Sequence, residues 1–149
     1  MTLDRRTTAI ALSVTATVLS ACDPGVHIAW QKRFGHQVKP SCVASALESV
    51  SPQVHRSTYL SAGDRGFPNG VQVTQFGYGD PSGGGDYNID IATVAVGKTN
   101  YWHGWSKLGT SIPPDERAKI LPLLYRANRA VAAACGLSFD DVLPEQGDG

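Results

Sequence analysis

The chain has 149 residues and carries 13 basic and 13 acidic residues, so its formal net charge at pH 7 is zero. This length fits one domain, and the balanced charge does not resemble that of a nucleic-acid-binding protein, which would carry a basic face or stripe. An apolar content of 42% is enough for a packed core and argues against wholesale disorder.

The first 22 residues differ in composition from the rest. Arg5 and Arg6 precede the uncharged run "TTAIALSVTATVLSA", from Thr7 to Ala21. The run has the length of the apolar region of a signal peptide and is shorter than the roughly 20 apolar residues of a membrane span. We therefore expect a signal peptide over residues 1–21. The alternative is a buried N-terminal helix.

The signal region ends in "LSAC", from Leu19 to Cys22. This sequence resembles the lipobox of bacterial lipoproteins, whose cysteine receives a diacylglyceryl group and becomes the first residue after cleavage. The resemblance implies that Cys22 is lipidated and that residues 22–26 form a short tether. It further implies a membrane-anchored protein of the bacterial cell envelope, facing the periplasm or the exterior. The competing interpretation is an ordinary signal peptide with an incidental cysteine.

The chain has three cysteines, so lipidation of Cys22 leaves Cys42 and Cys135. In the oxidising compartment of an exported protein, two thiols tend to form a disulfide. A crosslink that closes a loop of roughly 100 residues contributes about 4–5 kcal/mol in the chain-entropy model. The alternatives are two free, buried cysteines or, with less support, a Cys–His pair. No histidine flanks either cysteine closely.

The mature chain is expected to form one domain over residues 27–143, with a frayed tail over residues 144–149. Apolar residues at three- and four-residue steps predict a helix over residues 39–50. A second helix is predicted from Pro113 and Pro114 to Gly136, a typical C-terminal cap. Pro122 should kink this helix or split off its first turn.

Alternating apolar and polar residues predict the strands. The expected strands cover residues 54–61, 71–79 and 87–97, and residues 98–108 form either a fourth strand or an extension of the third. For residues 26–34 the sequence is compatible with either a strand or a helix, and we choose neither. The predicted fold is therefore α+β: an antiparallel meander of three to four strands, flanked in sequence by two helices that pack on one sheet face as a two-layer domain.

The segment "ATVAVGKT", from Ala92 to Thr99, formally matches a relaxed nucleotide-binding pattern. A phosphate-binding loop needs a Gly-rich turn between a strand and a helix, but "TVAV" is typical of a strand. We expect a strand that ends in a turn, and no nucleotide.

The densest aromatic group lies in "NYWHGW". Two interpretations stay open for its side chains. They either fill the core beneath the helices or form an exposed ligand surface that stacks on sugar rings or a protein partner. The candidate ligand-surface residues are Tyr101, Trp102, His103 and Trp105.

The remaining titratable residues show no metal-site spacing, and neither a metal nor a cofactor is expected. Asp86 and Asp90 lie four residues apart in a predicted strand and therefore point to the same side. They are either two solvated carboxylates or a pair for acid–base catalysis.

The expected function is that of a non-catalytic binding or accessory module that is anchored through its lipid and binds an envelope protein or glycan. The alternative is a small envelope hydrolase or carbohydrate-active enzyme that uses His103 or the Asp86–Asp90 pair.

Overall fold

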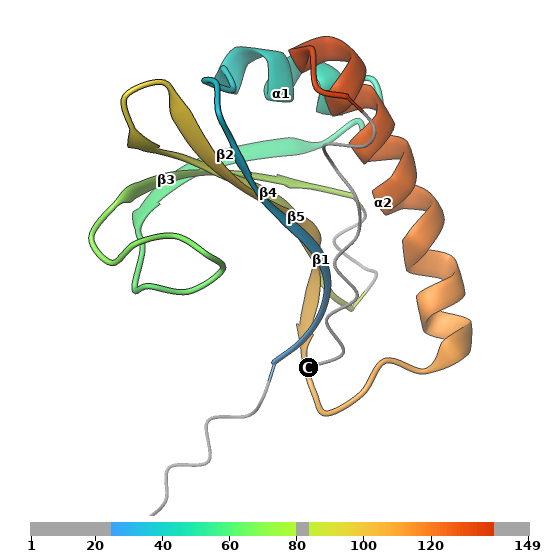
Figure 1. The fold of residues 1–149 in the computed structure, drawn as a ribbon. Coiled ribbons are helices and arrows are strands. Elements are labelled where there is room, and N and C mark those ends of the chain that lie inside the picture. Colours follow the sequence, from blue (N-terminus) through green and yellow to red (C-terminus); the bar gives the residue numbers. More distant parts are fainter. Residues whose placement is uncertain (1–24, 80–83, 139–149) are drawn as a thin grey trace, which may run out of the picture.

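A computed structural model describes residues 25–79 and 84–138 of the chain. The segment "LSAC" and the predicted tail lie outside the described residues. The order of elements is β1 (Gly25–Phe34), α1 (Pro40–Glu48), β2 (Val54–Leu60), β3 (Gln72–Tyr78), β4 (Asp86–Ala95), β5 (Lys98–Leu108) and α2 (Pro114–Cys135). The two helices and the single antiparallel sheet make the α+β class that the sequence predicts (Figure 1).

The sheet has five strands, in the order β1-β5-β4-β3-β2, rather than three to four. The additional strand is β1, the segment left open between strand and helix. Its residues Val26, Ile28 and Trp30 are buried in alternation, and it pairs with β5, where Ile28 lies opposite Trp105. Gly25 and Val26, expected in the tether, therefore belong to the sheet.

Strands β4 and β5 are separate and joined by a tight turn. Ala95 pairs with Lys98, Val96 is fully exposed, and Gly97 adopts a φ of +71°. The prediction that "ATVAVGKT" is a strand that ends in a turn is thus confirmed. No helix follows the turn, so this segment lacks the helix N-terminus that a phosphate-binding loop uses.

Helix α2 runs without interruption through Pro122, so of the two expected effects of Pro122, a kink or a split, the split is wrong. Proline removes the N–H that would bond to the carbonyl of Ala118. Both residues are exposed, so water can bind that carbonyl at little cost. The helix ends at Gly136, whose φ of +67° confirms the predicted cap.

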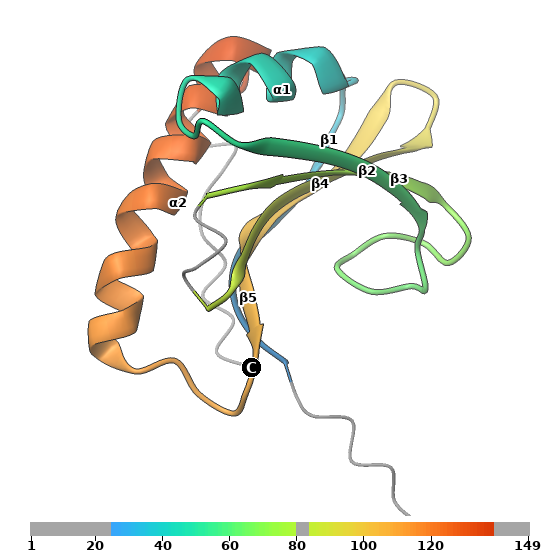
Figure 2. The same ribbon diagram turned by 180° about the vertical axis from the view of Figure 1, so that it is seen from behind.

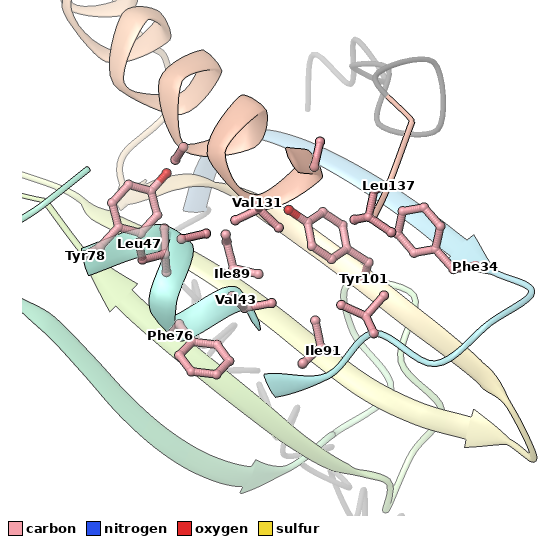
Figure 3. Close-up of a cluster of buried hydrophobic side chains, with 14 residues drawn as sticks. Phe34, Val43, Leu47, Phe76, Tyr78, Ile89, Ile91, Tyr101, Val131 and Leu137 are labelled. Atoms are coloured by element: carbon pink, nitrogen blue, oxygen red, sulfur yellow. The ribbon is translucent and has the colours of Figure 1, made fainter. Parts of the chain in front are cut away.

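Both helices lie on one side of the curved sheet (Figures 1 and 2). Val43 and Leu47 of α1 and Val131 of α2 are fully buried in one apolar cluster with residues of the strands (Figure 3). Close to this cluster, a disulfide joins Cys42 to Cys135, with the Cα atoms 5.3 Å apart. The predicted crosslink between the start of the first helix and the end of the last is present.

Part of the opposite face of the sheet is covered by the β2–β3 loop, residues 61–71. Phe67 of this loop is buried against Ala92 of β4 and Trp102 of β5. The helices therefore bury one face of the sheet, and the loop buries part of the other. Within the described ranges, no helix is long and apolar enough to cross a membrane.

Candidate functional site

The four aromatic and histidine side chains predicted as a candidate ligand surface are all buried. Tyr101, His103 and Trp105 lie on the helix side of β5, and Trp102 lies on the loop side. None is more than 2% exposed. Because neighbouring residues of a strand point to opposite faces, the sequence "YWHGW" contributes to two cores and does not form one exposed surface.

His103 is the centre of a buried polar network. Its Nδ1 lies 2.7 Å from Oδ1 of Asn128 on α2, and its Nε2 lies 2.5 Å from the hydroxyl of Tyr78. The amide oxygen can only accept, so Nδ1 donates to Asn128 and Nε2 accepts from Tyr78. The Trp30 ring stacks on the imidazole, with ring centroids 5.3 Å apart.

The surroundings of His103 keep its imidazole neutral. Burial lowers its pKa from 6.5 to about 4, although the hydrogen bond to Asn128 acts in the opposite direction. Burial also raises the pKa of the Tyr78 hydroxyl, which stays protonated. The network thus ties α2 to the middle of the sheet, and a neutral imidazole whose two nitrogens are both engaged is suited to a structural role.

Asp86 and Asp90 lie on the same side of β4, but their environments differ. Asp86 is exposed, as expected, whereas Asp90 is fully buried. The expectation of two solvated carboxylates is therefore wrong for Asp90. The reason is the β2–β3 loop, which covers Asp90 and brings a cation to it.

That cation is Arg65. Its Nη1 donates to Oδ2 of Asp90 at 2.8 Å, and the same oxygen accepts from the Tyr59 hydroxyl at 3.1 Å. Burial and the Asp90 carboxylate raise the pKa of Tyr59, so the phenol remains a donor. The guanidinium also stacks on Trp102, 4.1 Å from the ring centroid. The Asp90 carboxylate, the Trp102 ring and the conformation of the β2–β3 loop together hold Arg65 in place.

The β2–β3 loop holds the backbone of Arg65 in an unfavourable conformation. Its φ of +52° lies in the left-handed region, which costs a non-glycine residue about 1–3 kcal/mol and is concentrated at functional sites. Gly66 follows with a φ of +74°, and its carbonyl accepts a hydrogen bond from the side-chain amide of Asn100 at 2.6 Å. The loop tip is thus fixed to β5.

A second arginine is fixed beside the same loop. Arg33 of β1 donates from Nε to Oδ1 of Asn100 at 2.8 Å, while Asn100 is itself buried. A cavity of about 220 Å³ opens here between the loop and strands β1 and β5. It is lined by Gln31, Lys32, Arg33, Arg65, Gly66, Asn100 and Tyr101. None of these described lining residues is acidic.

The arginine pair was not predicted from the sequence. Arg33 belongs to the segment left open between strand and helix, and Arg65 lies in "AGDRGFPNG", interpreted only as a loop with turn signals. The usable signal was a charged residue between glycines in that loop. The candidate pair Asp86 and Asp90 does not form an acid–base site, because Asp86 is exposed and Asp90 is buried beside Arg65. Across residues 25–79 and 84–138, no three His, Cys, Asp or Glu side chains are grouped as a metal site would need.

In comparisons with known proteins, no family model matches the chain and no curated protein is significantly similar to it.

Proposed function

We propose that the chain is an exported bacterial lipoprotein, anchored to a membrane of the cell envelope through Cys22, whose α+β domain is a binding module. The observation that carries the proposal is the pairing of the cysteines. Cys42 and Cys135 are joined in the folded domain, which leaves Cys22, the cysteine of "LSAC", as the third. A disulfide also fits an oxidising compartment.

The position of β1 supports an anchor close to the domain. Only Asp23 and Pro24 separate Cys22 from Gly25, the first residue of β1. A fully extended chain spans at most about 3.6 Å per residue, so a lipid on Cys22 holds Gly25 within about 11 Å of it. Gly25 pairs with Leu108 at the end of β5, whose side chain is 76% exposed. This end of the sheet would face the membrane.

A binding role is favoured over catalysis by where the candidate catalytic residues lie. His103 is buried with both nitrogens engaged, and Asp90 is neutralised by Arg65 instead of facing Asp86. The cavity beside Arg33 and Arg65, in contrast, presents fixed donors to a ligand.

Mass spectrometry of the protein purified from bacterial membranes tests the proposal. The mature chain should begin at Cys22 and carry a diacylglyceryl mass on that residue. A chain cleaved elsewhere, or an unmodified Cys22, would contradict the lipoprotein assignment.

A further inference from the structure

The cavity between β1, β5 and the β2–β3 loop combines two guanidinium groups with neutral amides. Arg33 and Arg65 both line it, together with the side chains of Gln31 and Asn100. Arginine is a hydrogen-bond donor only, and its planar fork matches the two oxygens of a carboxylate. We infer that this cavity is a carboxylate-binding site.

The hydrogen bonds already made determine which donors remain. Arg33 uses Nε to bond Asn100, so the edge formed by its two terminal nitrogens is left for a ligand. Arg65 donates from Nη1 to Asp90. A guanidinium has five N–H donors, so others remain for a ligand. An ion pair and a ring hold Arg65, and one hydrogen bond holds Arg33, which reduces the side-chain entropy lost on binding.

The charges of the surrounding groups select a monoanion. Asp90 neutralises Arg65, so the two arginines together leave one positive charge. Among the described residues, no carboxylate lies within ion-pair distance of Arg33. Lys32 also lines the cavity, but strand alternation places its side chain on the opposite face of β1 from Arg33. Its ammonium lies there, 5.7 Å from the ring centroid of Phe34. One net charge suits a single carboxylate better than a phosphate dianion.

The volume indicates the size of the group that would fill the site. About 220 Å³ is below the roughly 300–1,000 Å³ of sites for drug-sized ligands. A carboxylate group with a few attached atoms would fill this open cavity. The inference rests on the proposed binding role and is independent of the lipid anchor.

Titration of the full-length chain in neutral detergent micelles tests the inference. The ¹H–¹⁵N signals of the arginine Nε–H groups report on the site, and the probes are acetate, its neutral analogue acetamide and inorganic phosphate, at constant ionic strength. We expect saturable shifts of the Arg33 and Arg65 signals with acetate, none with acetamide, and phosphate binding no tighter than acetate. An absence of saturation with acetate, or tighter binding of phosphate, would overturn the inference.

Two variants make the test specific. Arg33→Gln should weaken acetate binding by about tenfold or more, because it removes a hydrogen bond between charged groups. Arg129→Gln, at an exposed arginine of α2, should leave it unchanged, and equal losses in both variants would contradict a site at Arg33. A full set of dispersed backbone signals in each variant verifies that it folds. The acetate titration can be done with or without lipid on Cys22. A lack of acetate binding would therefore contradict the carboxylate site without contradicting the lipid anchor.

Discussion

The guanidinium of Arg65 lies 4.1 Å from the centre of the Trp102 ring while it donates to Asp90. This relationship joins a loop residue in the left-handed conformation to two strands of the sheet. It fixes the β2–β3 loop over one sheet face and completes one wall of the cavity. The strain at Arg65 is offset by a charged hydrogen bond and a stacked ring.

Asp90→Asn should destabilise the domain by about 2–4 kcal/mol, because loss of one member of a buried ion pair leaves the other without its counter-charge. Urea unfolding, monitored by tryptophan fluorescence, measures the change. The matched control is Asp86→Asn, on the same face of the same strand but exposed, where a change within about 0.5 kcal/mol is expected. Similar losses in both variants would show that the Arg65 pair contributes little.

The disulfide should account for much of the stability of the domain. Replacing Cys42 and Cys135 with serine is expected to lower the free energy of unfolding by about 4–5 kcal/mol, because the unfolded chain regains the freedom of a loop of roughly 100 residues. Denaturant unfolding with and without reductant measures the effect. The reductant should destabilise the wild type and leave the double variant unchanged. A wild type insensitive to reductant under unfolding conditions would contradict this account.

His103 should make stability depend on pH in a defined window. Its pKa is about 4 in the folded domain and near 6.5 in the unfolded chain, so the unfolded state binds the extra proton between these values. Stability is therefore lost as the pH falls from about 6.5 to about 4, by about 3 kcal/mol in total.

The variant His103→Gln should remove that part of the pH dependence, whatever its effect at neutral pH. His27→Gln, at an exposed histidine, should retain it. Unfolding free energies between pH 7 and pH 4 provide the comparison. An identical slope in the wild type and His103→Gln would show that His103 is not the buried neutral group described here.

Gly104 of β5 should tolerate no side chain. A Cβ atom at this position would lie 2.4 Å from the carbonyl oxygen of Ile28 and 2.7 Å from the Cβ of Ala29, both in β1. Gly104→Ala should cost about 1–3 kcal/mol through overpacking and loosen β1, which amide hydrogen exchange would detect. Gly35→Ala, where a Cβ meets no atom within 4 Å, is the control. Undisturbed protection of β1 in Gly104→Ala would contradict the close pairing.

Local sequence patterns predicted most of the fold, since the periodicity of Val43, Ala46 and Leu47 identifies α1 without its surroundings. They could not place β1, because its pairing with β5 joins segments far apart in the chain. They also could not reveal the burial of Asp90 or the pairing of its carboxylate. Both depend on the conformation of the β2–β3 loop, which no local rule specifies. The same limit applies to the arginine pair of the cavity.

The most direct test of the proposed function is the membrane partition of the protein with and without Cys22. Wild type and Cys22→Ala are expressed in a bacterium that processes lipoproteins, and their membrane and soluble fractions are compared after washing with high salt. The wild type should remain with the membrane, and Cys22→Ala should lose both the lipid mass and the cleavage before residue 22. Identical processing and lipid content in the two proteins would contradict the anchor.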